Sequence, residues 1–386
     1  MKVIFNKETV FNGLQNAIAI MPSKTGAAFL RSVWIVVEND SITFQSTDAN
    51  IEFTGTYGAE VEEPGMVGVQ GQIFYGLINN CMGKIELTYK EDDATLYLHH
   101  KNGVCKLPVV TNNWFQAMTP FPEENVIYWT GEFLQTAINQ VTYCIDEDSS
   151  LDALTCILIK PQLQVPGKMD ICGLNGHQFA MYSMVHEDMV SKLPKDGLLI
   201  QKNYLQQITK WLPKDEILIN YTDKRIFFKK NNNEVLSVPR STYQFPDYNN
   251  FLSKLNVDSV SYLNLHRSDL KSALQRISTV NTDIKNCTDF YISENRNMIN
   301  CSAKGENSGE VLEKFPVEYD GDIKRITFRT KDLLIILDHF SSEEITMKMT
   351  TDEGPCGILG DDDPFYLVVV MPIKTIESAY ESEEPA

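Results

Sequence analysis

Residues 72–87 read QIFYGLINNCMGKIEL, and this stretch sets the pattern for the whole chain. Phe74, Leu77 and Cys81 stand at positions i, i+3 and i+7, which predicts one apolar stripe along an amphipathic helix. After a short turn, residues 85–87 alternate between apolar and polar side chains, as a strand with one buried face does. The stretch therefore predicts a helix followed by a strand.

The same helix–strand pattern recurs twice, in residues 205–219 and in residues 333–347. A second predicted helix opens each repeat, with apolar residues at i, i+4 and i+7. Its three copies hold Val10, Leu14 and Ala17, then Leu134, Ile138 and Val141, then Leu270, Leu274 and Ile277. Each of the three repeats therefore combines two helices with antiparallel sheets. This pattern predicts an α+β fold of three tandem domains.

The repeat also predicts the domain boundaries. We expect domains over 1–122, 123–254 and 255–375, followed by an acidic tail over 376–386. The tail is rich in Glu and poor in apolar residues, so we expect it to be disordered.

Composition narrows the class of protein. The 386 residues include 34 Lys and Arg against 52 Asp and Glu, a net charge of −18. This balance disfavours a protein that coats nucleic acid over its whole surface or binds anionic membranes. No run of 18 apolar residues indicates a membrane span, and the N-terminus turns polar too soon for a secretory signal. The eight cysteines form no CxxC pair, so we expect free thiols in a reducing cytoplasm.

The positive charge gathers on the predicted helices. The six windows that cover them carry a net charge of +6, which leaves −24 for the rest of the chain. A mildly basic helical layer indicates one face for a polyanion, with weak and sequence-independent phosphate contacts. The windows are residues 7–24, 71–84, 131–145, 201–214, 267–280 and 329–340.

Signatures of catalysis are missing from the sequence. It has no GxxxxGK[ST] loop, GxGxxG, HExxH or GxSxG motif, and no His pair at helical zinc-site spacing. The run Asp361–Asp363 can hold a cation, but Pro364 and an apolar strand follow it, which favours a solvated turn. We therefore expect no catalytic residues, metal or cofactor.

Four short motifs resemble those of one family. They are the Ser46–Asp48 turn, GLNGHQFA at 173–180, FPDY at 245–248 and VVVMPI at 368–373. In this order and on a threefold repeat, they resemble the bacterial DNA polymerase III β subunit, the sliding clamp. The likeness runs from residue 1 to about residue 375. Leu174, Asn175 and Gln178 depart from the family's usual Thr, Asp and Arg.

The resemblance implies a ring-forming homodimer that encircles duplex DNA without reading its sequence, with helices lining the hole and sheets outside. Simple geometry agrees, because six packed helices in a circle leave a hole of only about 7 Å and twelve leave about 24 Å. The implied partners are DNA polymerase III, the clamp loader and other proteins with short Leu- and Phe-containing peptides. The implied location is the bacterial cytoplasm, at the nucleoid.

Three sets of site residues follow from the resemblance alone. The partner-peptide groove would be lined by Leu154, Leu174, Gly176, His177, Phe179, Pro246, Phe251, Val369, Met371, Pro372 and Ile373. The DNA-facing positions would be Lys24, Gln72, Asp148, Asp152, Ala153, Lys202, Lys210, Arg267, Lys271 and Arg276, of which Gln72, Asp148, Asp152 and Ala153 depart from the family pattern. The dimer interface would pair Cys105 and Leu107 with Thr279 and Val280.

Two other functions stay open at this point. One is a clamp-fold scaffold dedicated to repair or plasmid replication, which the sequence does not separate from a replicative clamp. The other is an acidic metal-dependent hydrolase or nuclease with carboxylate ligands near Asp361–Asp363.

Overall fold

The computed structural model describes residues 1–22, 27–110, 113, 115–147, 150–257, 259–281, 286–305 and 308–374. The predicted disorder of the acidic tail concerns residues outside this part. The chain forms two units, each described by itself. The first comprises Met1–Ile138 and Glu187–Thr242, and the second comprises Asn139–His186 and Tyr243–Ala386.

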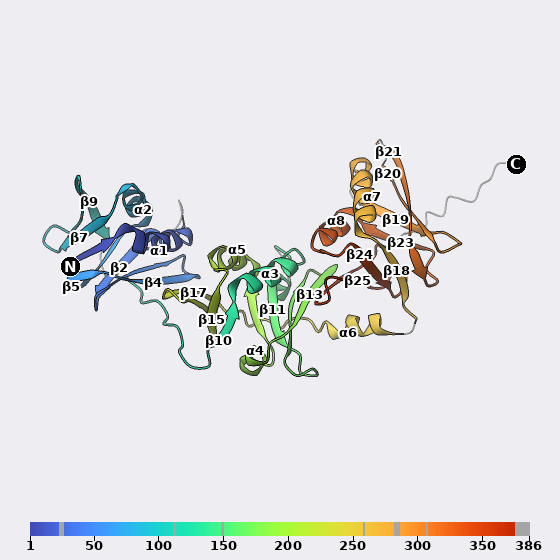
Figure 1. Ribbon diagram of the computed structural model, residues 1–386, viewed down its shortest axis with the longest axis horizontal. Helices are drawn as coiled ribbons and strands as arrows, with labels where there is room; N and C mark the ends of the chain where they lie inside the picture. Colours follow the sequence, from blue (N-terminus) through green and yellow to red (C-terminus); the bar gives the residue numbers. More distant parts are fainter. Residues whose placement is uncertain are drawn as a thin grey trace. The chain divides into compact units, whose positions relative to one another are not determined.

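The first unit is built on one 13-stranded sheet with antiparallel pairing throughout (Figure 1). Across the sheet the strands are β10 (Ile127–Thr130), β15 (Glu216–Tyr221), β16 (Arg225–Lys230), β17 (Glu234–Pro239), β4 (Glu52–Gly58), β3 (Ser41–Thr47), β2 (Ser32–Glu38), β6 (Gly65–Gln70), β9 (Gly103–Val110), β8 (Thr95–His100), β7 (Lys84–Lys90), β1 (Lys2–Asn6) and β5 (Glu60–Glu63). The unit also holds β14 (Leu198–Gln201) and the helices α1 (Lys7–Ala19), α2 (Gly71–Asn80), α4 (Glu187–Lys192) and α5 (Lys202–Trp211).

The second unit contains two groups of antiparallel strands. Eight neighbouring strands are β11 (Cys156–Pro161), β12 (Lys168–Leu174), β13 (Gln178–Val185), β26 (Tyr366–Val370), β25 (Cys356–Gly360), β24 (Glu344–Met349), β18 (Ser261–His266) and β22 (Glu318–Asp320). Four more are β21 (Gly309–Pro316), β20 (Met298–Gly305), β19 (Cys287–Ile292) and β23 (Arg325–Arg329). The helices are α6 (Asn249–Leu252), α7 (Arg267–Val280) and α8 (Thr330–Asp338), and residues of α3 (Gly131–Thr142) belong to both units.

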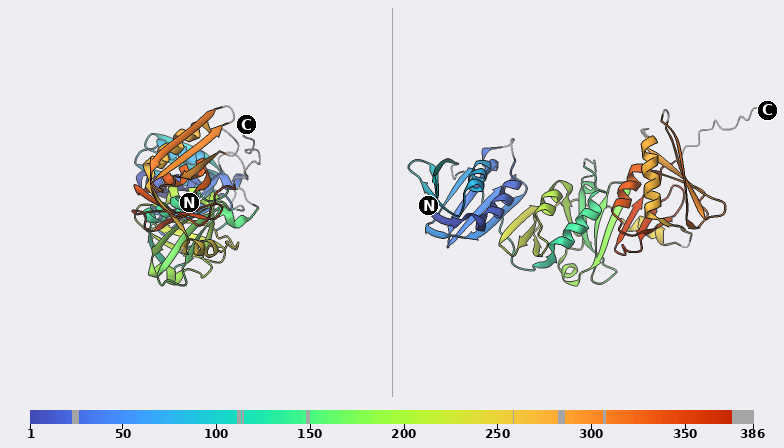
Figure 2. Two further views of the ribbon diagram at one scale, coloured as in Figure 1. Left: turned by 90° about the vertical axis from the view of Figure 1, so that its right-hand side faces the viewer. Right: turned by 45° about the horizontal axis from the view of Figure 1, so that its top comes forward.

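The predicted helix stripes lie in the core. Val10, Leu14 and Ala17 of α1 have no exposed surface, and the matching residues of α3 and α7 are also buried. Helix α1 packs on α2 and α7 packs on α8, while α7 also lies along β20 and β21 (Figure 2). The antiparallel α+β architecture and the paired helices are therefore confirmed.

One position in the predicted stripes is wrong. Leu77 is only half-buried, whereas Ile78 is fully buried one residue later. Helix α2 ends at Asn80, so its buried face runs from Phe74 to Ile78 at i, i+4, and Cys81 packs from beyond the helix end. A short helix buries the i, i+4 pair that faces the sheet, and spacing alone did not choose between Leu77 and Ile78.

In the first unit, β4 of the first repeat pairs with β17 of the second, from Gly55↔Glu234 to Glu52↔Ser237. The Glu234 carboxylate is 1% exposed and accepts four hydrogen bonds. Their donors are Tyr57 Oη at 2.9 Å, Asn16 Nδ2 at 2.9 Å, Lys230 Nζ at 3.0 Å and Asn232 Nδ2 at 3.0 Å. We call these five residues the Glu234 cluster; it joins side chains from two repeats.

Gly13 makes room for one member of this cluster. A Cβ atom at residue 13 would lie 1.5 Å from the Tyr57 hydroxyl oxygen. Only a residue without a side chain lets Tyr57 cross α1 and reach Glu234.

In the second unit, β13 of the second repeat pairs with β26 of the third, from Gln178↔Val370 to Tyr182↔Tyr366. The Tyr366 hydroxyl donates to the Gln140 carbonyl at 2.9 Å and lies 2.9 Å from the Tyr143 hydroxyl. Tyr143 in turn stacks on His339 with 4.1 Å between ring centroids, and Tyr366 packs against Phe340 at 4.9 Å. Aromatic rings therefore surround this second junction.

All eight cysteines are free, as predicted, and each is buried or half-buried. Burial raises the pKa of the thiols of Cys144, Cys301 and Cys356, which keeps them protonated. In the described part of the chain, no helix has the length and apolar character needed to cross a membrane.

Candidate functional site

The predicted groove residues lie at one end of four neighbouring strands of the second unit. Leu174 ends β12 and stands opposite Phe179 near the start of β13, and Phe179 stands opposite Val369 near the end of β26. Leu154 belongs to the 3₁₀ turn Asp152–Thr155, which leads directly into β11 at Cys156. Because β11 pairs with β12, Leu154 lies at the same end of the sheet as Leu174.

A tight turn joins β12 to β13 at this end. Gly176 has φ +82°, and the Asn175 side-chain oxygen accepts bonds from the His177 N–H at 3.1 Å and the Gln178 N–H at 2.8 Å. The left-handed conformation explains a glycine here, and the Asn side chain closes the turn. The turn exposes His177, whose carbonyl accepts the Met371 N–H at 2.9 Å.

Aromatic side chains cover the sheet face beside this turn. Phe179 stacks on Tyr248 with 5.3 Å between centroids and meets Phe251 edge-to-face at 4.9 Å. Phe179 and Tyr248 are buried, whereas Phe251 is half-buried and Pro246 is exposed. The segment that carries the FPDY motif is therefore held over the strand ends by ring packing.

Burial divides the eleven predicted residues into a floor and a rim. Leu154, Phe179, Val369 and Pro372 are buried, Leu174, Phe251 and Ile373 are half-buried, and Gly176, His177, Pro246 and Met371 are exposed. Met371, 39% exposed, is the largest apolar side chain on the rim. An apolar floor with an adaptable methionine at its edge suits a short peptide with apolar anchors.

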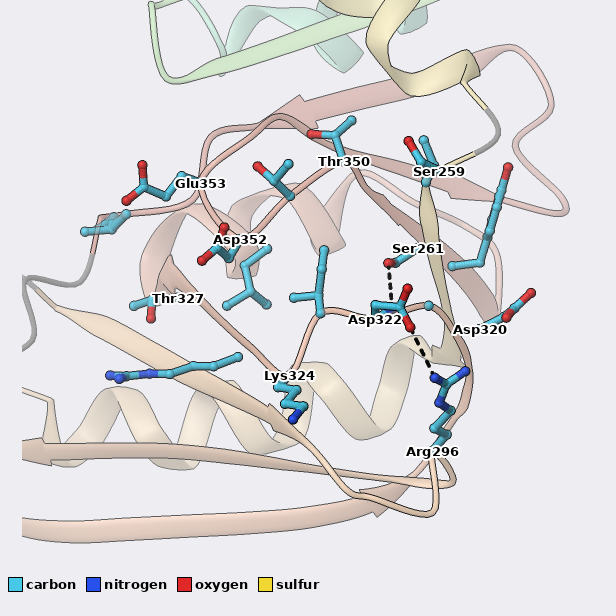
Figure 3. Close-up of a pocket in the computed structure, with 18 residues that line it drawn as sticks. Ser259, Ser261, Arg296, Asp320, Asp322, Lys324, Thr327, Thr350, Asp352 and Glu353 are labelled. Carbon is cyan, nitrogen blue, oxygen red and sulfur yellow. Dashed lines mark hydrogen bonds and ion pairs between the residues drawn. The ribbon is translucent and has the colours of Figure 1, made fainter.

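A polar depression of about 970 Å³ lies in the third repeat (Figure 3). Of the predicted groove residues, Ile373 alone lines it within the part of the chain described here. Arg296 lies 3.3 Å from Asp322 in it, and the Asp322 N–H donates to the Ser261 hydroxyl at 3.4 Å. Polar and charged side chains make up most of its lining, in contrast to the residues of the predicted groove.

The predicted DNA-facing residues are found in contrasting environments. Gln72 of α2 and Lys210 of α5 are exposed, while Lys202 is half-buried. Lys24 and Asp148 lie outside the described residues. Ala153 is only 8% exposed, so its side chain does not present a surface to DNA. The charge of Asp152 acts on the neighbouring Tyr243 and raises the pKa of its hydroxyl.

The three cations predicted on α7 are held within the third repeat. Arg267 donates to the carbonyls of Ser342 at 2.7 Å and Leu337 at 3.3 Å, beside the C-terminal end of α8. Lys271 lies 2.5 Å from the Asp338 carboxylate. Arg276 forms a two-pronged pair with Glu313 at 2.7 Å, and this bond holds the pKa of Glu313 below its ordinary value.

Sequence reasoning passed over two further exposed cations. Arg329 and Lys331 flank the start of α8, and both side chains are exposed. The charge count included them, but the family motifs did not point to either. The count itself was the available signal, because helix surfaces with unpaired Lys and Arg attract phosphate.

The predicted interface residues lie beside two strand edges. Residues 103–108 of β9 pair with β8 on one side, and β6 reaches only residues 109 and 110 on the other. Strand β21 pairs with β20 along its whole length and, within the described residues, with no other strand. Cys105 and Val280 are half-buried and Thr279 is exposed, but Leu107 is 5% exposed and packs inside its own unit.

The acidic run Asp361–Asp363 forms a turn rather than an open cation site. The Asp363 carboxylate accepts the backbone and hydroxyl hydrogens of Ser341 and Ser342, with the Ser341 Oγ at 2.7 Å. Among the described residues, no three His, Cys, Asp or Glu side chains gather in a metal-binding group.

Comparisons with known proteins agree on one family. Residues 1–118 match the family model for the N-terminal domain of the DNA polymerase III beta subunit. The beta sliding clamp of Chlamydia muridarum is 23% identical over 388 residues, covering 97% of this chain and 99% of that protein. The beta sliding clamp of Bacillus subtilis is 19% identical over 391 residues, with 97% and 100% coverage.

Solved structures give the same result for the fold. The crystal structure of the DNA polymerase III subunit beta from Pseudomonas aeruginosa aligns with a TM-score of 0.85 at 18% identity, over 97% of this chain and 100% of that one. The pol III beta of Caulobacter crescentus aligns with a TM-score of 0.86 at 17% identity, with the same coverage. Residues 1–118 thus match the N-terminal domain of the DNA polymerase III beta-subunit family, and the whole chain has the fold of solved beta subunits.

Proposed function

We propose that this chain is a replicative sliding clamp, a non-catalytic subunit that encircles duplex DNA as a head-to-tail dimer and tethers DNA polymerase III. The observation that carries the proposal is that four strand ends and the FPDY segment bring the apolar residues of the predicted groove together in a chain with the clamp fold. Tethering raises the local concentration of a polymerase at the primer end, so a weak peptide contact gives long residence on DNA.

The groove supports the tethering half of the proposal. Its floor is buried and apolar, and its rim offers Met371, His177 and Pro246 to a bound chain. A peptide with Leu and Phe anchors buries its apolar side chains there, and the turn at Gly176 adds exposed polar groups for orientation. The polymerase, the clamp loader and other clamp-binding proteins would share this site.

The helical layer supports the DNA half. Lys210, Arg329 and Lys331 are exposed on or beside helices, while the α7 cations contact carbonyl or carboxylate oxygens of their own repeat. With few exposed cations, and with the uncharged Gln72 among the exposed positions, the helices would contact DNA phosphates weakly. They would not recognise base edges. Weak phosphate contacts are sufficient for a closed ring, because the ring itself keeps the DNA from dissociating.

Two strand edges support the dimer. Among the residues that the structure describes, no strand pairs with the outer side of β9 over residues 103–108 or with the outer side of β21, so a second chain can add a strand at either edge. Lys106 on β9 and Glu310 on β21 add opposite charges. A contact between two different surfaces closes into a two-membered ring when the rotation permits.

The groove is tested by replacing Met371 and Pro372 with Ala. We expect the double variant to lose stimulation of a processive polymerase on primed circular DNA while keeping its sedimentation coefficient. A gel-based primer-extension assay measures the first property and analytical ultracentrifugation the second. Stimulation equal to that of the unaltered protein would refute the groove assignment.

The dimer is tested at Val104, which is 49% exposed on β9, rather than at the buried Leu107. A V104E substitution places a charge on the free edge without entering the core, and we expect it to shift the protein from dimer to monomer. T95E on neighbouring β8, which is already paired on both sides, is the matched control. Dimers that persist in V104E at micromolar concentration would contradict this interface.

A further inference from the structure

One buried carboxylate lies on the same sheet face as the groove. Asp170, 1% exposed, shares a face of β12 with Cys172 and Leu174, because alternate residues of a strand point the same way. The opposite face is closed: a Cβ atom on Gly173 would lie 2.4 Å from the Val141 carbonyl oxygen of α3. Asp170 therefore sits on the side of the sheet away from the helix.

The charge of Asp170 is met by three neutral donors. Gln162 Nε2 donates to both carboxylate oxygens at 2.7 Å, the Ser183 hydroxyl donates at 2.6 Å and the Tyr248 hydroxyl donates at 3.0 Å. A buried ionised group is expensive unless it is fully hydrogen-bonded, so each donor is held firmly. Lys160 stands opposite Asp170 in the β11–β12 register.

Only one of these donors reaches the groove. The Tyr248 ring stacks on Phe179, and Phe179 meets Phe251 edge-to-face, which is the half-buried aromatic residue at the groove surface. Gln162 lies beyond the end of β11 that is remote from the groove, and Ser183 is paired with Asp170 on β13. A continuous series of contacts thus runs from Asp170 through Tyr248 to the groove floor.

We propose that Asp170 is a positioning residue for the peptide groove: by holding the Tyr248 hydroxyl, it fixes the orientation of the Phe179–Phe251 pair that receives the apolar anchor of a partner peptide. This rests on the groove function proposed above. A fixed ring presents a preformed surface, so binding does not lose additional side-chain entropy. The family motifs include Tyr248, but none of them includes Asp170.

The test compares two variants that each remove one hydroxyl donor from the same carboxylate. Y248F keeps the stacked ring and removes its bond to Asp170, while S183A removes the other hydroxyl and leaves Tyr248 bound. The probe is a fluorescein-labelled synthetic peptide with one Leu and one Phe separated by a Ser and flanked by Gly, and binding to the full chain is followed by fluorescence anisotropy. Thermal unfolding of each variant is recorded alongside.

We expect Y248F to weaken peptide binding by about fivefold and S183A to leave it unchanged, although both lower the unfolding temperature. Equal affinities for the two variants would overturn the inference, because Asp170 would then matter only for stability. If Y248F does not fold, D170N takes its place: it keeps the side-chain size, weakens the bond to Tyr248, and should also bind less tightly than S183A. Failure of the unaltered chain to bind the peptide would instead refute the groove itself.

Discussion

The two junctions between repeats use the same strand pairing but opposite side-chain chemistry. The β4–β17 junction of the first unit is reinforced by the Glu234 cluster, a buried carboxylate with an ammonium, a phenol and two amides around it. The β13–β26 junction of the second unit is reinforced by ring packing, with Tyr143 stacked on His339 and Tyr366 tilted against Phe340. An ionic cluster depends on every member, whereas ring packing loses its contacts gradually.

This difference has an electrostatic cause. Burial raises the pKa of Tyr57, and the Glu234 charge raises it further, so the phenol remains a donor throughout the ordinary pH range. The aromatic junction instead places neutral hydroxyls against a backbone carbonyl and each other. Removing one charge should therefore lower the stability of the β4–β17 junction more than removing one hydroxyl lowers the stability of the β13–β26 junction.

The largest effect is expected for E234Q. The substitution keeps the side-chain size but leaves Lys230, whose side chain is 15% exposed, without its counter-charge. We expect the stability of the β4–β17 region to fall by about 2 kcal/mol, since a buried pair that loses one partner leaves an uncompensated charge. Hydrogen exchange of the β4 and β17 amides measures this locally.

A variant without either charge is the control for that experiment. K230M/E234Q removes the ammonium as well as the carboxylate charge, and the glutamine oxygen can still accept the Tyr57 hydroxyl. Protection of the β4–β17 amides should therefore recover toward the unaltered level, because no uncompensated charge remains. Exchange in E234Q that matches the unaltered protein would erase the proposed difference between the junctions.

A smaller effect is expected for Y366F in the second unit. The ring stays in place against Phe340, but the Gln140 carbonyl and the Tyr143 hydroxyl lose their partner. We expect a local loss of about 1 kcal/mol. Hydrogen exchange of the β13 and β26 amides measures this loss of local stability. A loss of stability larger than that in E234Q would contradict the expectation that the first junction is the more sensitive of the two.

The smallest expected effect is a pH dependence of the stability of the second unit, which comes from Asp363. Burial would raise the pKa of Asp363, but the bonds from Ser342 and Ser341 outweigh it, so its pKa lies below the ordinary value of 3.8. Because the folded-state pKa is depressed, its contribution to stability is full above pH 3.8 and is lost as pH falls through the folded-state value. Thermal unfolding from neutral pH down to about pH 3 should show this loss, and D363N should lack it.

Local patterns predicted the elements well but not the junctions. The stripes at Val10, Leu14 and Ala17 or at Leu270, Leu274 and Ile277 repeat within one helix, so periodicity alone finds them. Glu234 and Asp170 look like ordinary surface acids in the sequence. Their partners Tyr57 and Tyr248 lie far along the chain, and only the fold brings them within hydrogen-bonding distance.

The candidate site shows the same limit. The motifs predict most of the groove residues, because GLNGHQFA, FPDY and VVVMPI are short and contiguous. They did not separate buried Phe179 and Val369 from exposed His177 and Met371, nor place Leu107 inside its unit. The charge count likewise treated Arg276 as available, although Glu313 holds it. Pairing and burial depend on distant residues that no local pattern records.

The pairing of β13 with β26 also has a consequence for the order in which the chain is made. Synthesis proceeds from the N-terminus, so Gln178–Val185 is complete long before Tyr366–Val370 leaves the ribosome. Until then one side of β13, including the groove residue Phe179, has no strand beside it and offers an open edge to other nascent chains. The first junction closes earlier, once Glu234–Pro239 has emerged. A ribosome stalled between these two points would hold a finished first unit and an aggregation-prone second one.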